Sequence, residues 1–164
     1  MNNKSEVDRA VSVASGILIF ADNTEKKLRE KLSKKGFDDG TVSEAIELLR
    51  EAGLVNDGRL IRNTIEYLAN RKLYGRARLK PELAKRGFDR DLIDGVFDEY
   101  TSDIDFKGNC LKLVRRKGLE SKFLDKETRK NVAGSLARSG YSYPEMKYAL
   151  GVIIKENTDG NTEE

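Results

Sequence analysis

The residues most able to do chemistry in this sequence are basic side chains, gathered near its middle and again in a short run further along. Guanidinium and ammonium groups in such clusters neutralise phosphates and make nucleic-acid binding salt-dependent, and they equally attract an acidic protein surface. The alternative is a solvated face that only keeps the protein soluble. The candidate binding residues are Arg71, Lys72, Arg76, Arg78, Lys80, Lys85, Arg86, Arg115, Arg116 and Lys117.

Carboxylates are the second group to consider, because two or three converging acids can hold the magnesium ion of a nuclease. Asp103 and Asp105 are candidates for such a site. We prefer a structural interpretation, in which Asp89 and Asp91 lie at the start of a helix, where negative charge is favourable. The remaining acids near them would lie on the polar side of that helix.

Several residue types and motifs that enzymes commonly use do not occur in the sequence. It contains no histidine and a single cysteine, so a zinc site is not indicated. Glycine-rich phosphate-binding loops and the serine nucleophile elbow are absent as well. We therefore predict no catalytic residue, no metal ion and no cofactor.

Composition favours a helical protein of the cytoplasm. Charged residues make up 36% of the 164 residues, the net charge is +3, and two prolines leave room for long uninterrupted helices. Cys110 has no partner for a disulfide, which suits a reducing compartment, and we expect it to be a small buried residue in a helix. No apolar run approaches the roughly 20 residues that span a bilayer, so no membrane contact is expected.

The elements that would carry these side chains repeat three times along the chain. The repeated pattern is two apolar residues four apart, then a glycine, an aromatic residue and Asp or Ser. Its glycines are Gly36, Gly87 and Gly140, which are 51 and 53 residues apart. Glycine reaches the left-handed conformation that ends a helix, and Asp or Ser suits the N-cap of the next. In the third copy, Ser142 and Glu145 form a capping-box signature.

Amphipathic segments on either side of each pattern complete a unit of three helices. Val42, Ala45, Ile46 and Leu49 have counterparts at the same offsets in the other two copies, and an apolar segment at 10–21 is the first of three preceding helices. We predict an all-α protein of three tandem three-helix repeats, stacked into an elongated, curved array. The expected repeats are 8–57, 58–104 and 105–155, followed by a disordered acidic tail at 156–164.

The order of three motifs resembles the RecX family of RecA regulators. Residues 24–37 are similar to the family pattern S-x-x-E-L-x-x-K-L-x-x-K-G-[FY], residues 53–61 to G-L-[LI]-[ND]-D-E-R-F-A, and residues 72–88 to K-x-x-G-x-x-[RK]-[IL]-x-x-E-L-x-x-[KR]-G. The third match is the most specific, and the resemblance covers residues 8 to 155. Departures occur at Thr24, Lys27, Gly58 and Leu60.

The resemblance implies a cytoplasmic, monomeric regulator that binds and does not catalyse. Its expected partner is the RecA recombinase filament, in whose helical groove family members lie, usually inhibiting strand exchange, ATP hydrolysis and coprotease action. Contact with single- or double-stranded DNA would be weak or indirect. A protein that binds DNA directly without RecA is the alternative, and its binding would be tight and sensitive to salt.

Overall fold

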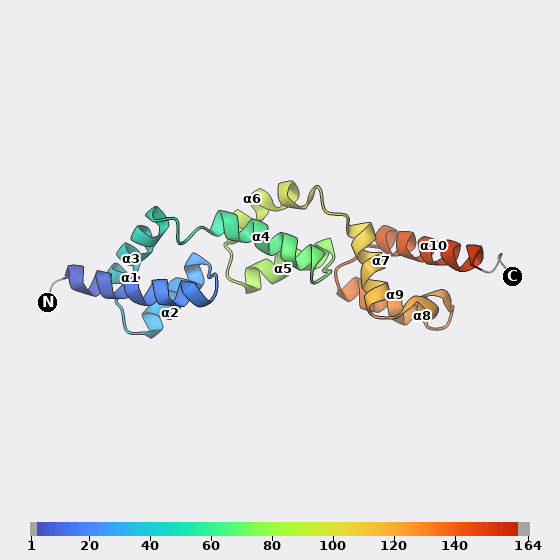
Figure 1. Ribbon diagram of the computed structural model, residues 1–164, viewed down its shortest axis with the longest axis horizontal. Coiled ribbons are helices and arrows are strands. Elements are labelled where there is room, and N and C mark those ends of the chain that lie inside the picture. Colours follow the sequence, from blue (N-terminus) through green and yellow to red (C-terminus); the bar gives the residue numbers. More distant parts are fainter. Residues whose placement is uncertain (1–2, 161–164) are drawn as a thin grey trace. The chain divides into compact units, whose positions relative to one another are not determined.

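The structure is a computed structural model that describes residues 3–160, and within that range it contains helices and no strand (Figure 1). The all-α prediction is therefore confirmed. The helices are α1 (Asn3–Phe20), α2 (Glu25–Lys34), α3 (Asp39–Glu51), α4 (Asp57–Asn70), α5 (Arg76–Lys85), α6 (Arg90–Thr101), α7 (Phe106–Arg116), α8 (Glu120–Leu124), α9 (Arg129–Arg138) and α10 (Tyr143–Asp159).

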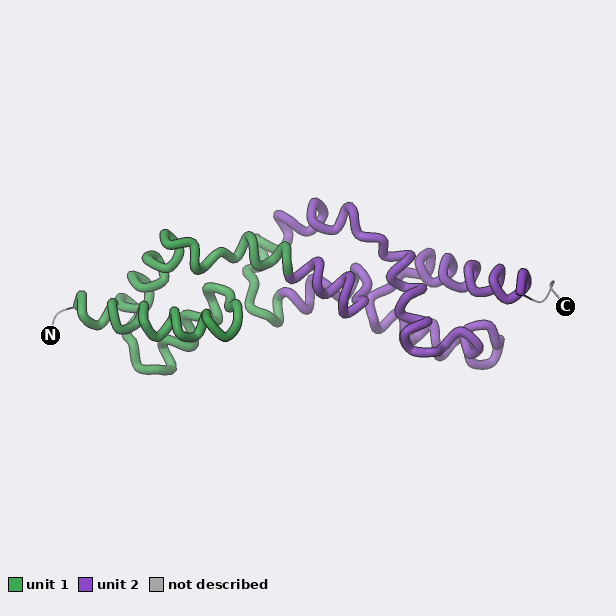
Figure 2. The backbone as a smooth tube through the Cα atoms, in the orientation of Figure 1, with its two compact units in different colours: residues 1–63, 84–93 green, residues 64–83, 94–164 purple. Residues whose placement is uncertain are grey.

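The chain divides into two compact units, shown in green and purple in Figure 2. Unit 1 contains the chain up to residue 63 together with residues 84–93, and unit 2 contains residues 64–83 and the chain from residue 94 onward. The division passes through α4, α5 and α6. Three repeats with the boundaries given above, and their stacking into a curved array, stay predictions.

In unit 1, helices α1, α2 and α3 pack against one another around a small apolar core. Helix α1 begins at Asn3, earlier than the apolar stretch 10–21 predicts, because Val7 shares a buried face with Ala10 and Ala14. At the other end of α1, Ile19 and Phe20 are 79% and 90% exposed, so the apolar segment 10–21 is not buried along its whole length.

In unit 2, α10 packs along α7, and both α8 and α9 contact α10. The short helix α8 is an addition to the predicted three-helix pattern. It follows Gly118, whose φ of +60° ends α7, and it buries Phe123 in the same core as Val114 and Leu136. Leu119 is the N-cap residue of α8.

The three predicted glycine turns have the expected conformation. Gly36, Gly87 and Gly140 have φ values of +92°, +96° and +98°. The aromatic residue that follows each one folds back and is buried: Phe37, Phe88 and Tyr141. The caps also form, since Asp38 accepts from the Thr41 N–H at 2.9 Å, Asp89 from the Asp91 N–H at 2.9 Å, and Glu145 from the Ser142 N–H at 2.6 Å.

Two of these glycines lie directly against the first turn of another helix, and we call these the glycine contacts. In unit 1, a Cβ added to Gly87 would lie 2.8 Å from Thr24 Oγ1, just before α2. In unit 2, a Cβ added to Gly140 would lie 2.6 Å from Arg78 N in α5, and one added to Gly75 would overlap the carbonyl of Gly140. Gly87 meets side-chain atoms of Thr24 and Lys27, whereas Gly75 and Gly140 meet through their backbones.

Helix α10 continues to Asp159, four residues into the segment for which we expect disorder. Residues 161–164 of that segment lie outside the described part of the chain. Within it, Arg115 forms an ion pair with Glu156 at 2.6 Å, which holds the last turns of α10 to α7. The expectation of a disordered tail as a whole stays a prediction.

Cys110 lies in α7 with a fully buried side chain, as the sequence predicts. Burial raises the pKa of its thiol to about 12, and the Coulombic influence of Glu145 adds to that rise. The thiolate is the reactive form of cysteine.

We expect Cys110 to be protected from thiol reagents while the protein is folded. Near pH 8, roughly one molecule in 10⁴ would carry the thiolate, given a pKa four units higher. Reaction with Ellman's reagent should be slow in buffer and immediate in concentrated guanidinium chloride. Equal rates in the two conditions would contradict the buried position.

The glycine contact of unit 2 should be intolerant of a single methyl group. Gly75→Ala places a Cβ inside the Gly140 carbonyl, and the required backbone shift should cost about 1–3 kcal/mol. The matched control is Gly95→Ala in α6, where an added Cβ meets nothing within 4 Å and should stabilise the helix by up to about 1 kcal/mol. Urea unfolding monitored by circular dichroism measures both, and equal midpoints for the two variants would contradict the contact.

Candidate functional site

The predicted basic residues divide between the two units. Eight of them belong to unit 2, while Lys85 and Arg86 belong to unit 1, where they are exposed at the end of α5 just before Gly87. Unit 2 therefore holds both the segment 71–80 and the run 115–117.

The first part of the site is the turn that joins α4 to α5. It reverses at Leu73, a non-glycine residue with φ of +57°, and the segment between α9 and α10 holds it in place. The hydroxyl of Tyr141 donates to the Leu73 carbonyl at 2.8 Å, and the Gly75 N–H donates to the Ser139 carbonyl at 2.7 Å. Burial raises the pKa of Tyr141, so this hydroxyl stays protonated and remains a donor.

Helix α7 brings the second basic run to this turn. The buried side chain of Asn109 donates to the Ala69 carbonyl at 3.1 Å and to Asn70 Oδ1 at 2.9 Å, which fixes α7 across the end of α4. At the C-terminal end of α7, the guanidinium of Arg116 donates to the carbonyls of Arg71 and Lys72 at 2.9 and 3.0 Å. The planar fork of arginine suits two neighbouring acceptors in this way.

Arg116 therefore joins two basic stretches that lie far apart in sequence. We define the cationic corner as Arg71, Lys72, Arg116 and Lys117. The side chains of Arg71, Lys72 and Lys117 are exposed, and no ion pair within residues 3–160 occupies them. The Lys72 ammonium lies 5.8 Å from the ring centroid of Tyr67, which is 45% exposed. The corner presents uncommitted positive charge beside an accessible aromatic ring.

The other basic residues of the segment are engaged inside the unit. Arg76 donates to Asp98 at 2.6 Å and to the buried hydroxyl of Thr101 at 2.5 Å, which ties α5 to α6. Lys80 pairs with Asp94 at 2.7 Å. The guanidinium of Arg78 lies 3.8 Å from the ring centroid of Tyr74. Neighbouring acids or aromatic rings contact these cations. They therefore contribute less to the electrostatic potential at the protein surface than the sequence suggests.

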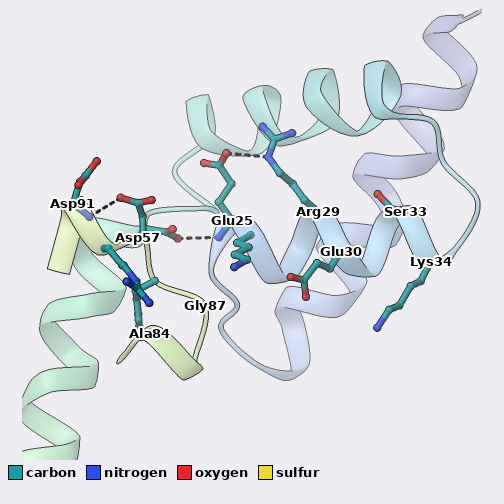
Figure 3. A pocket seen from close by; sticks show the side chains of 13 residues that line it. Glu25, Arg29, Glu30, Ser33, Lys34, Asp57, Ala84, Gly87 and Asp91 are labelled. Carbon is teal, nitrogen blue, oxygen red and sulfur yellow. Dashed lines mark hydrogen bonds and ion pairs between the residues drawn. The ribbon is translucent and has the colours of Figure 1, made fainter. Parts of the chain in front are cut away.

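Unit 1 contains a groove of about 1040 Å³ beside its glycine contact, between α2 and the segment 84–91 (Figure 3). Its walls carry both signs of charge. Glu25 pairs with Arg29 at 3.0 Å and with Arg50 at 2.6 Å, and its N–H donates to Asp57 at 3.0 Å. Burial would raise the pKa of Glu25, but the two arginines lower it below its ordinary value. Burial raises the pKa of Asp57.

A smaller groove of about 420 Å³ lies at the equivalent place in unit 2, beside Arg76, Lys80 and Tyr141. Both grooves are lined by the first turn of one helix and by a glycine turn of the next repeat. Both grooves adjoin a glycine contact, and side chains of both charge signs line each of them.

The carboxylates do not assemble into a metal site. Between residues 3 and 160, no three acids, cysteines or histidines lie close enough together to hold an ion. Asp105 accepts from the Gly108 N–H at 2.9 Å and caps α7, while Asp94 and Asp98 are the partners of Lys80 and Arg76. In the same range no helix combines the length and apolarity needed to cross a membrane.

No protein-family model matches the chain, but curated proteins and solved structures resemble it along most of its length. The regulatory protein RecX of Stenotrophomonas maltophilia (strain R551-3) is 32% identical over 85% of this chain and 83% of its own. The regulatory protein RecX of Clostridioides difficile (strain 630) is 30% identical over 89% of this chain and 68% of its own.

The fold is similar to that of a solved relative as well. The crystal structure of RecX from Lactobacillus salivarius has a TM-score of 0.75 to this one, with 20% identity, and covers 93% of this chain and 97% of its own. This likeness in fold agrees with the identity to the curated relatives, which extends across both units. The chain belongs to the RecX family of regulatory proteins.

Proposed function

We propose that this protein binds the filament that RecA recombinase forms on DNA and inhibits its recombinase, ATPase and coprotease activities. Membership of the RecX family carries the proposal. The protein acts through contact and not through catalysis. It works in the cytoplasm as a monomeric regulator, and its contact with DNA is weak or made through the filament.

The cationic corner is the part of the chain that best suits such a partner. A filament loaded with DNA is a strongly negative polymer, and charges that are not paired within the protein increase both the rate and the strength of encounter with it. Arg71, Lys72 and Lys117 supply this charge, and Arg116 holds the turn that carries two of them. Lys85 and Arg86, exposed in unit 1, extend the set of available cations.

Arg76, Arg78 and Lys80 have a different part in this proposal. They tie α5 to α6 and cover Phe97 and Tyr74, so they keep the segment 71–80 in shape. Arg115 likewise holds α10 through Glu156. Because their charges are paired within the unit, their replacement should weaken filament binding less than replacement of the unpaired cations of the cationic corner.

The first test is RecA ATPase on single-stranded DNA, titrated with wild-type protein and with the triple variant Arg71→Glu, Lys72→Glu, Lys117→Glu. Wild-type protein should inhibit at amounts comparable to RecA. The same inhibition should require a concentration of the variant that is higher by roughly tenfold or more, because three attractive charges become repulsive. Since all three side chains are exposed, the melting temperature should change little.

The matched control is Lys122→Glu, Lys126→Glu, Lys155→Glu, which makes the same change of charge at exposed positions elsewhere in unit 2. Inhibition by this control should stay near the wild-type level. If both triple variants lose inhibition equally, net charge and not the cationic corner governs binding. If wild-type protein has no effect on the ATPase, the proposed function itself is wrong.

A direct DNA-binding protein is the second candidate, and the exposed Tyr67 beside Lys72 is the observation that favours it. Basic residues next to an accessible ring are typical of single-strand binding, in which bases stack on the ring. If the protein binds DNA directly, it should bind bare oligonucleotides tightly, and its affinity for them should fall steeply as the salt concentration rises. If it regulates the filament, it should bind bare DNA more weakly than RecA-coated DNA at the same ionic strength. Fluorescence anisotropy with both ligands across a salt series decides between them.

A further inference from the structure

Helix α10 carries an apolar stripe that the rest of unit 2 covers only in part. Tyr143, Leu150 and Ile154 share one face of this helix, because their spacing is close to a whole number of turns. Helices α8 and α9 both contact α10. Tyr143 and Ile154 nonetheless remain 72% and 45% exposed. Within unit 2, the stripe therefore leaves apolar surface open to a partner.

A groove of about 200 Å³ lies along this stripe, and we call it the α10 groove. Phe123 of α8 and Ala133 of α9 line one side, and Tyr143, Met146 and Leu150 of α10 line the other. A cavity of about 150 Å³ in another protein holds a molecule the size of benzene. The α10 groove is therefore large enough for one aromatic or branched aliphatic side chain.

The charged residues that line the α10 groove are two cations, Arg129 and Lys147, and no acid lines it. The guanidinium of Arg129 donates to the carbonyls of Phe123 and Leu124 at 2.9 and 2.6 Å, which holds α8 against the start of α9. Lys147 is exposed, and it pairs with no acid between residues 3 and 160. Its ammonium group is available to a ligand in the groove.

The chain next to Phe123 and Arg129 adds further positive charge. The segment 122–130 contains four cations and two acids. One of these acids, Asp125, already accepts from the N–H and the hydroxyl of Thr128, each at 2.9 Å. The lysines of this segment are exposed and form no ion pair within the described chain: Lys122, Lys126 and Lys130. A groove that is apolar inside and positive around it complements an apolar side chain flanked by acids.

We propose that the α10 groove binds an acidic peptide segment of a partner protein. One aromatic or branched aliphatic side chain of the peptide inserts between α9 and α10, and the carboxylates on either side of it face Lys147 and the lysines of 122–130. The contact is much smaller than a standard protein interface, so the groove recognises a short motif weakly. It shares no residue with the cationic corner, and this activity goes beyond the proposed function.

A peptide suits the α10 groove better than a nucleic acid does. Sequence-specific recognition of a base requires hydrogen-bonding groups directed at its edge. Arg129 uses its donors on backbone carbonyls, and Phe123, Met146 and Leu150 have no such groups. Apolar walls of this kind suit the insertion of an apolar side chain, as in grooves that bind amphipathic peptides.

Fluorescence anisotropy of the full chain with fluorescein-labelled peptides tests the proposal. The first peptide carries one phenylalanine between two runs of glutamate, and it should bind saturably. In a second peptide serine replaces the phenylalanine, and in a third glutamine replaces every glutamate. Each of these two should bind roughly tenfold more weakly or worse, because one lacks the anchor and the other lacks the charges. Absence of saturable binding by the first peptide, or equal binding by the serine peptide, would overturn the proposal.

Lys147→Glu should lower the affinity for the first peptide roughly tenfold, because a cation beside the anchor becomes a repulsive acid. The matched control is Lys155→Glu, which makes the same change at an exposed position of the same helix outside the groove. Lys155 lies roughly 12 Å further along α10, beyond the screening length at physiological salt, so its replacement should change the affinity by less than about twofold. Both variants should melt like the wild type. Equal losses in the two variants would mean that net charge and not the groove governs binding.

A second pair of variants tests the apolar wall. Tyr143→Ser should weaken binding of the first peptide roughly tenfold, whereas Tyr148→Ser should leave it nearly unchanged. Tyr148 is 46% exposed on the same helix, but it lies beside Lys107 and does not line the groove. Amide NMR signals of Ala133 and Leu150 should shift on addition of the peptide. Shifts centred on the cationic corner would refute the assignment.

Nucleic acid is the other class of ligand that these cations could attract. If Lys147→Glu weakens binding of a bare oligonucleotide and no acidic peptide binds, the groove is not a peptide site and the proposal is wrong. None of these measurements contains RecA. Their outcome therefore leaves the proposed function as it stands.

Discussion

The close approach of a glycine turn to the first turn of a helix is the contact on which the rest of this structure depends. The two backbones meet with no side chain between them, as the space around Gly75 and Gly140 shows. This distance is accessible only to residues without a Cβ at the point of contact. In unit 1, a Cβ added to Gly87 would instead meet side-chain atoms of Thr24 and Lys27. The packing of the start of α5 in unit 2 therefore depends on glycine at both Gly75 and Gly140.

The position of the cationic corner follows from the same contact. Because the Gly75 and Ala77 N–H groups donate to the carbonyls of Ser139 and Gly140, the preceding turn is fixed in space. Its carbonyls accept hydrogen bonds from Arg116 at the end of α7 and from the hydroxyl of Tyr141, which lies between α9 and α10. The side chains of Arg71 and Lys72 are exposed. The available charge on the surface is thus a consequence of how the backbone polar groups are satisfied.

Positive charge in a sequence and positive charge available to a partner differ greatly in this protein. Arg76, Lys80 and Arg115 have acids within 2.7 Å, and these acids come from other helices. Surface ion pairs of this kind contribute little to stability, but they remove charge from the field that a partner meets. A regulator that acts by contact therefore depends on a small number of unpaired side chains. The excess of +3 in the whole chain gives no guide to their number or place.

The sequence by itself determined the helical class, the family, and the local geometry of each repeat. Glycine in the left-handed region, the buried aromatic residue after it, and the Asp caps follow from interactions within a few residues, which sequence spacing encodes directly. It did not determine helix α8, the exposed end of α1, or the continuation of α10 to Asp159, because tertiary packing decides where an amphipathic segment stops. Only the tertiary structure decided which basic residues are free. Arg116 reaches carbonyls more than forty residues away, and Arg76 reaches Asp98 on another helix. Which side chains pair between two helices depends on the angle and position at which the helices cross. The spacing of residues along the chain does not determine that geometry.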